Sequence, residues 1–370
     1  MSTFCTRVIK VEQPIAPIYI AKINSSDLLS MSVVDRRHIV DDDEVLGIQR
    51  ELKLDKVRQI KKYLSTYEAT FPNSIIVNVK KEDLISVDEN EIMLRKKEDT
   101  FTIIDGQHRL AGFEGYTGPL FELIVTIFID LRIDQQAEIF STINSQQTKV
   151  DPSLNVSLVL SDPLFTPKKM IVEIAQSFNF DKESPWYNNI KKTSGNNDGN
   201  DGLITLSAFS KPLFDLTFPE SDWYLIKNAL SVNPQKPNFD FDANYKMERF
   251  PFWFFYKNRD SASVYKILWN YFKVLQSLLE DDWLNQESLL NKTTGYNAMI
   301  HLFKDLVPLC INERSFNYSF ILQLLDPLKA LNGSITSSNY GTSGTYASNQ
   351  LFRAFWEAIE PSLKKKSTNG

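Results

Sequence analysis

The fold of this chain is decided by the stretch Thr102-Ile-Ile-Asp-Gly-Gln-His-Arg-Leu-Ala-Gly112. A β-branched and aromatic run over residues 100–104 is broken by Asp105-Gly106, and apolar residues then return at helical spacing. This change of period from two to about 3.6 residues predicts a strand, a tight turn and a helix.

The predicted turn places a carboxylate, an amide, an imidazole and a guanidinium within five residues, at the start of a helix with unpaired backbone N–H groups. Such a start favours anions, and Arg109 could hold a phosphate bidentately. Alternatively, Asp105 caps the helix, Gly106 supplies a positive φ, and Gln107 and His108 face water with Arg109. Because Arg and His are unfavourable beside the positive end of a helix unless an anion lies there, the cluster favours a phosphate site.

The same residues resemble a known family. Asp105-Gly-Gln-His-Arg109, followed by Leu-Ala-Gly, resembles the signature of the DGQHR-domain family, which includes the DndB proteins of bacterial DNA phosphorothioation systems. Residues 136–154, in which an Ile-Asn pair precedes a polar stretch and a new helix, resemble the downstream block of that family. The family is in turn similar to the ParB/sulfiredoxin-like fold, whose related strand-turn-helix motif holds nucleotide phosphates.

This resemblance adds candidate ligands outside the turn. Gln49-Arg50 resembles a motif that precedes a helix in related proteins, Ser74 follows Asn73 in a turn before a strand, and Asn144 matches the downstream block. The candidate ligands for nucleotide, phosphate or DNA are Arg50, Gln49, Gly106, Gln107, Arg109, Asn144, Gln147 and Ser74.

The segment after Gln49 is the most basic of the chain. Its basic residues are Arg50, Lys53, Lys56, Arg58, Lys61 and Lys62, and apolar residues recur at helical spacing among them. These side chains either form a solvated helix face or contact phosphate, and the sequence leaves both open.

The composition limits the class of protein. With 370 residues, 42% hydrophobic residues and a net charge of −5, the chain is expected to be a well-packed soluble protein that does not coat DNA nonspecifically. Its two cysteines form no disulfide or zinc pattern, which favours a reducing compartment. The first thirty residues lack a signal-peptide core, and the most apolar run, 123–131, is too short to span a bilayer. We expect a cytoplasmic protein.

The predicted fold is α+β. An α/β, ParB/sulfiredoxin-like part with a mixed sheet is expected over 1–160, with its first strand near 15–23. Residues 161–215 form a connecting segment whose polar loop, 194–202, is expected to be mobile. Amphipathic stripes over 264–279, 299–306 and 351–363 predict a helical domain over 216–370.

Several kinds of chemistry have no support. The chain has no Walker A, GxGxxG, GxSxG or HExxH motif, and only three histidines without neighbouring metal ligands, so intrinsic zinc is not expected. A nucleotide carrying Mg²⁺ stays open, because that ion needs few protein carboxylates, and Asp105 is the first to test.

Three functions are compatible with these observations. The first is binding of nucleotide or nucleic-acid phosphate in DNA modification, defence or its regulation, alongside other proteins of such a system. The second is hydrolysis of a nucleoside triphosphate, or nicking of DNA, with Asp105 and His108 in acid and base roles. The third is a non-catalytic module that binds protein partners through its helical half.

Overall fold

A computed structural model describes residues 2–33, 38–41, 44–46, 52–145, 151–191, 203–285, 287–341 and 344–367 of the chain. The chain divides into two compact units, Met1–Lys149 and Val150–Gly370. Each unit is described by itself. The expected boundary near residue 160 and the expected connecting segment stay predictions, and the loop 194–202 lies outside the described residues.

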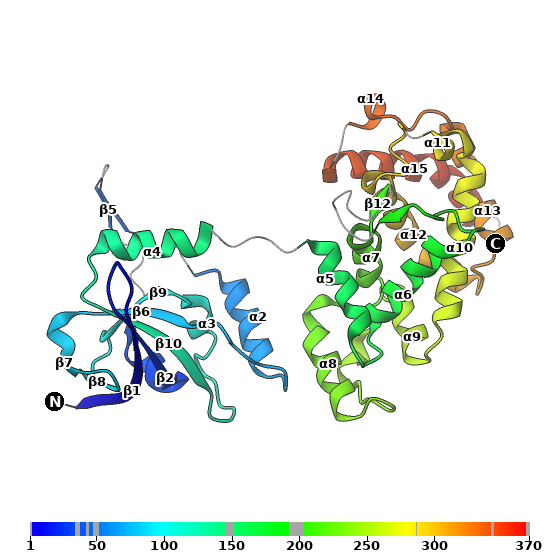
Figure 1. The fold of residues 1–370 in the computed structure, drawn as a ribbon. Coiled ribbons are helices and arrows are strands. Elements are labelled where there is room, and N and C mark those ends of the chain that lie inside the picture. The colour runs from blue at the N-terminus through cyan, green and yellow to red at the C-terminus, as the bar shows by residue number, and fades with distance from the viewer. Residues whose placement is uncertain are drawn as a thin grey trace. The chain divides into compact units, whose positions relative to one another are not determined.

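The first unit is built on an eight-stranded sheet (Figure 1). In spatial order its strands are β3 (Ser32–Val33), β9 (Phe101–Asp105), β6 (Ile75–Val79), β10 (Glu122–Ile129), β2 (Ile18–Asn24), β1 (Thr3–Val11), β8 (Glu91–Arg95) and β7 (Leu84–Val87). The pairs β3–β9 and β6–β10 are parallel, whereas the other neighbours are antiparallel. The sheet is therefore mixed, as predicted.

Helices cover both faces of this sheet. On one face, Leu28 of α1 (Ser25–Ser30), Leu64 of α2 (Leu54–Leu64) and Leu110 of α3 (Gln107–Ala111) join the main core of the unit. On the other face, α4 (Ile133–Ser145) packs Ile139 and Phe140 against a smaller cluster. A separate hairpin consists of β4 (His38–Asp41) and β5 (Glu44–Leu46). Successive residues of a strand point to opposite faces, so the two clusters lie on opposite sides of the sheet.

The strand β1 was not foreseen in the sequence. It pairs with both β2 and β8, so it lies inside the sheet rather than at its edge. Most of its residues alternate between exposed and half-buried positions, and Val8 is the one buried residue. An alternation of this kind carries little apolar contrast, which is why the hydrophobic pattern began only near residue 15.

The second unit is helical. Its helices are α5 (Pro152–Leu158), α6 (Pro167–Phe180), α7 (Leu206–Asp215), α8 (Trp223–Val232), α9 (Pro251–Lys257), α10 (Ser261–Leu278), α11 (Glu280–Leu284), α12 (Thr293–Asn312), α13 (Tyr318–Leu325), α14 (Ser337–Tyr340) and α15 (Gly344–Ser367). A short parallel pair joins β11 (Ile190–Lys191) to β12 (Ile204–Thr205). One continuous core runs from α5 to α15, and the predicted amphipathic stripes face it. The α+β class with a helical C-terminal part is thus confirmed.

Short 3₁₀ turns complete the connections. They are Lys81–Asp83, Val159–Ser161, Glu220–Asp222, Asp240–Asn244 and Asp326–Leu331. Among the described residues, none of the helices combines the length with the apolar character that crossing a membrane requires.

A buried carboxylate fixes the loop after the last of these turns. Asp282 in α11 is 1% exposed, and its oxygens accept hydrogen bonds from the backbone N–H groups of Gly333 at 2.5 Å and Ile335 at 3.0 Å. The Ser288 hydroxyl donates to the same carboxylate at 3.2 Å. Since buried backbone donors need partners, Asp282 acts as the anchor of the 333–335 segment.

Candidate functional site

The predicted strand, turn and helix lie where the sequence places them. β9 ends at Asp105, Gly106 adopts φ 97° and ψ 12°, and α3 begins at Gln107. A Cβ atom at Gly106 would lie 2.5 Å from Ile75 Cδ1 and 3.1 Å from Arg109 Nη2. Glycine is therefore required here both by the left-handed backbone and by the close approach of β6.

The sheet topology brings three connecting segments to the same end of neighbouring strands, which is called the site edge below. β9 is antiparallel to β6, and β6 is parallel to β10. The end of β9 therefore lies beside the beginnings of the other two strands, with Asp105 opposite Ile76. The Asp105–Arg109 turn, the segment before β6 and the segment before β10 share the site edge (Figure 1).

Arg109 ties the turn to the segment before β6. Its Nη2 lies 2.8 Å from Asp105 Oδ2, and its Nη1 donates to the carbonyl oxygen of Asn73 at 2.6 Å. Both side chains are about three-quarters buried or more, with 20% and 26% exposure for Arg109 and Asp105. The adjacent Ser74 Oγ lies 3.0 Å from Thr126 Oγ1 in β10. The guanidinium thus braces the site edge, which carries Asp105, Asn73 and Ser74.

His108 joins the turn to the basic helix α2. Its Nε2 accepts a hydrogen bond from the backbone N–H of Lys53 at 3.0 Å, at the residue that precedes α2. An imidazole nitrogen that accepts a hydrogen bond carries no proton, so His108 is neutral in this arrangement. Burial lowers the pKa of His108, the charges of Lys56 and Lys53 lower it further, and Asp105 opposes them.

The lowered pKa gives a pH prediction. We expect the pKa of His108 to lie below its ordinary value of about 6.5. NMR of the imidazole Cε1–H signals across a pH titration measures it. Only three histidines are present, so His108→Gln assigns the signal. Because the unfolded chain binds the proton more readily, the contribution of His108 to stability is complete above the unfolded pKa and is lost as the pH falls through the folded one. A pKa at or above the ordinary value would contradict this.

The structure describes only some of the other predicted ligands. Gln107 is 6% exposed at the start of α3, so it is buried at the turn. Gln49, Arg50 and Gln147 lie outside the described residues. Asn144 lies in the last turn of α4, and its side chain is likewise not described. Their roles as ligands stay predictions.

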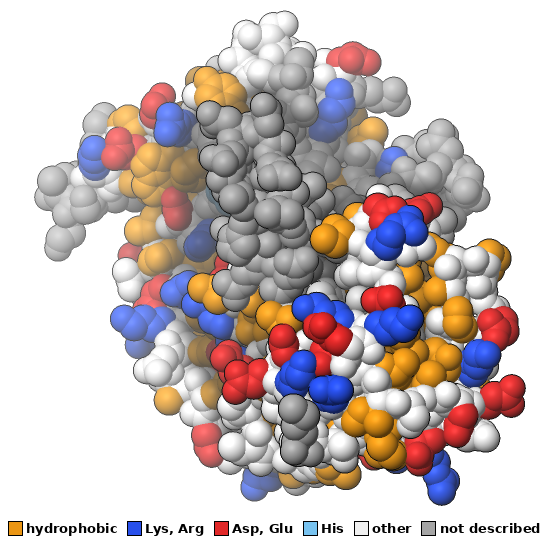
Figure 2. All heavy atoms as spheres, turned by 90° about the vertical axis from the view of Figure 1, so that its left-hand side faces the viewer, with side chains coloured by type: hydrophobic (Ala, Val, Ile, Leu, Met, Phe, Trp, Pro, Cys, Tyr) orange, Lys and Arg blue, Asp and Glu red, His pale blue; other side chains and the backbone are white. Residues whose placement is uncertain are grey.

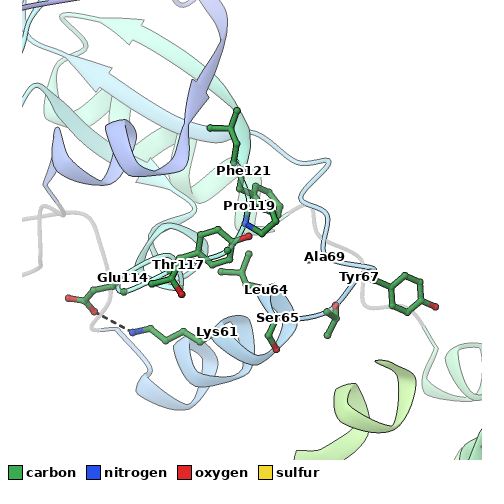
Figure 3. A pocket seen from close by; sticks show the side chains of 15 residues that line it. Lys61, Leu64, Ser65, Tyr67, Ala69, Glu114, Thr117, Pro119 and Phe121 are labelled. Atoms are coloured by element: carbon green, nitrogen blue, oxygen red, sulfur yellow. Dashed lines mark ion pairs between the residues drawn. The ribbon is translucent and has the colours of Figure 1, made fainter. Parts of the chain in front are cut away.

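Two features of the site carried no signal in the sequence. One is the contact between His108 and the backbone of Lys53, which depends on tertiary packing. The other is a cavity of about 670 Å³ at the opposite end of α2, between residues 61–69 and the loop 112–121 (Figure 3).

The charge around the site is local. Figure 2 shows one face of the molecule, on which basic and acidic side chains are interspersed. At the start of α2, Lys53 and Lys56 are both exposed near His108, and Asp55 between them pairs with Arg58. In the described part of the chain, no group of three or more His, Cys, Asp or Glu side chains could hold a metal ion.

Comparison with known proteins agrees with the sequence motif. The model of the family DndB, described as DNA-sulfur modification-associated, matches residues 6–218, which is more than half of the 370 residues. The matched range includes the Asp105–Arg109 turn and α2. A comparison with curated proteins found no match. The resemblance inferred from the motif is thereby confirmed.

Proposed function

Because the chain belongs to the DndB family of DNA-sulfur modification-associated proteins, we propose that its Asp105–Arg109 turn and the beginning of α2 bind a phosphate group of a nucleotide or nucleic acid. The biological setting of this binding is a DNA-sulfur modification system, together with its other proteins.

The contact between His108 and Lys53 carries the proposal. It holds the imidazole beside two exposed ammonium groups, Lys53 and Lys56, and both lower the pKa of His108. The two positive ammonium groups repel each other, and an anion that pairs with both of them relieves this repulsion. A phosphate at this point would also raise the pKa of His108, because a nearby negative charge favours the imidazolium. The NMR titration above therefore doubles as a binding assay.

Each residue of the turn then has a distinct role. Lys53 and Lys56 supply charge, whereas Arg109 positions the turn through Asp105 and the Asn73 carbonyl. Asp105 Oδ2 and His108 Nε2 are both engaged within the protein. We therefore propose binding rather than turnover as the function of the site edge, with Gln107 and Asn144 as groups that orient the ligand.

A paired charge-removal experiment tests the phosphate site. ATP, GTP, CTP, a short duplex and a single strand are first compared by thermal shift, with and without Mg²⁺. For a nucleic acid that binds, we expect Lys53→Gln/Lys56→Gln to reduce the slope of log K against log [salt] by about 1.4 to 1.8, because two phosphate contacts are lost. For a mononucleotide, the same pair should abolish the thermal shift.

The control removes the same charge elsewhere. Lys80 and Lys81 are exposed just after β6, at the other edge of the sheet. Lys80→Gln/Lys81→Gln should leave the slope and the thermal shift unchanged. Equal effects of the two pairs, or no binding of any of these ligands, would overturn the proposal.

A further inference from the structure

The cavity at the far end of α2 has a polar but largely uncharged interior. Its charged lining residues, Lys61 and Glu114, face each other at 3.7 Å with side chains 43% and 78% exposed. Figure 3 shows this pair at the margin, with Leu64 and Ser65 from α2 on one side and Thr117 and Pro119 from the loop on the other. Its volume of about 670 Å³ lies in the range of small-ligand sites.

Aromatic rings and hydroxyl groups form the walls. Tyr116 is held against Phe113 and Phe121 at ring distances of 5.5 and 6.4 Å, both edge to face. A Cβ atom at Gly118 would lie 2.4 Å from Tyr116 Oη, so the loop backbone rests directly on this ring. Tyr67 lines the rim, and its ring, which is 60% exposed, points away from the cavity (Figure 3). The cavity therefore offers preformed aromatic surface without an internal charge.

Hydroxyl groups of the lining suit the edge of a flat polar ligand. Ser65, Thr66 and Thr117 all line the cavity. Thr66 donates to the carbonyl oxygen of Tyr63 at 2.8 Å, so its hydroxyl oxygen keeps its capacity to accept. Aromatic faces combined with hydroxyl oxygens match a nucleobase, which stacks and also presents amide and amino donors.

Helix α2 connects this cavity to the proposed phosphate site. Its 11 residues span about 16 Å, with Lys53 at the His108 end and Lys61 at the cavity. That length corresponds to about five stacked nucleotides at ~3.4 Å each, or fewer in an extended strand. One continuous strand can therefore place phosphates along the basic side of α2 and a base in the cavity.

We propose that the cavity binds one unstacked base of a single-stranded nucleic acid whose phosphates follow α2 toward His108. This inference rests on the proposed function and narrows its ligand to an oligonucleotide. Charge complementarity selects this occupant over an apolar protein side chain, because Lys53 and Lys56 are exposed along the approach whereas the cavity interior is uncharged.

The test separates the base from the phosphates. Fluorescence anisotropy with the full chain compares a labelled octamer of deoxythymidine with an octamer of abasic residues, which keeps every phosphate. We expect the abasic octamer to bind about 5- to 150-fold more weakly, the effect of one stacked base. A single thymidine at the third, fifth or seventh position of the abasic octamer should restore most of this difference at one position at least.

Variants locate the effect in the cavity. Thr117→Trp fills the cavity from its exposed loop and should remove the preference for thymidine, whereas Thr3→Trp, on the exposed start of β1, should not. Thr117→Phe offers a second, smaller filling of the cavity, and Thr3→Phe is its control. Circular dichroism confirms folding of each variant.

The outcomes distinguish the two proposals. Equal affinity for the thymidine and abasic octamers, or a preference that survives Thr117→Trp and Thr117→Phe, would overturn the base site while leaving the phosphate site intact. If neither octamer binds while a mononucleotide does, the phosphate site stands and the single-strand inference is wrong. Absence of binding by every nucleotide and nucleic acid would remove both.

Discussion

Gly106→Ala is expected to lower the free energy of unfolding of the first unit by about 2–4 kcal/mol and to weaken phosphate binding at the turn. About 1–2 kcal/mol comes from forcing a residue with a Cβ into φ 97°. The remainder comes from the new atom, 2.5 Å from Ile75 Cδ1 and 3.1 Å from Arg109 Nη2, which must push β6 or the guanidinium away. Urea unfolding followed by circular dichroism measures the first effect, and the thermal-shift assay the second.

Gly115→Ala is the matched control. Gly115 also has a positive φ, 75°, but a Cβ atom there would have nothing within 4 Å. This variant should therefore show the backbone term alone, about 1–2 kcal/mol. If both variants cost the same, the close packing of β6 on the turn does not contribute, and the bracing role assigned to Arg109 loses its support.

Asp282→Ala is expected to destabilise the helical unit by about 3–5 kcal/mol. The substitution leaves the N–H groups of Gly333 and Ile335 without their acceptor, and each buried donor without a partner costs about 1–3 kcal/mol. Ser288 loses less, because its hydroxyl also lies 3.0 Å from the carbonyl oxygen of Ile335. Thermal unfolding by calorimetry should show the loss in the transition of the helical unit.

The neighbouring carboxylate provides the comparison. Asp281 makes a side-chain contact with Asn332 at 2.8 Å, and this hydrogen bond is exposed. Asp281→Ala should therefore cost about 0.5–1.5 kcal/mol, as expected for a hydrogen bond whose partner can bind water instead. Similar losses for the two variants would mean that water replaces the buried carboxylate, and that the 333–335 segment does not depend on it.

Local patterns predicted the motif and the class of the fold. The strand, turn and helix over 102–112 could be predicted because the change in the spacing of apolar residues and the turn residues lie next to each other in the chain. Three helices of the second unit, α10, α12 and α15, could be read because each carries its own apolar stripe. Strand β1 could not, since its burial comes from pairing with β2 and β8 and not from its own sequence.

The contacts of the predicted site residues could not be foreseen from the sequence. Arg109 was expected to hold phosphate, yet the structure gives its guanidinium a partner that no sequence pattern marks, the backbone carbonyl of Asn73. The same applies to His108, whose partner is a backbone N–H. Backbone groups carry no residue identity, so contacts to them become visible only when the chain is folded. The roles of both side chains toward a ligand stay predictions.

The sheet order also has a consequence for the kinetics of folding. β2 finds its partner β10 only after the whole span between them has been made, since Ala21 pairs with Val125. Non-local pairings of this kind slow folding, because a long loop must close before its contacts form. During synthesis, the growing chain therefore holds β1 and β2 without β10 beside them until residue 129 has emerged. We expect this interval to be when the nascent protein depends most on chaperones.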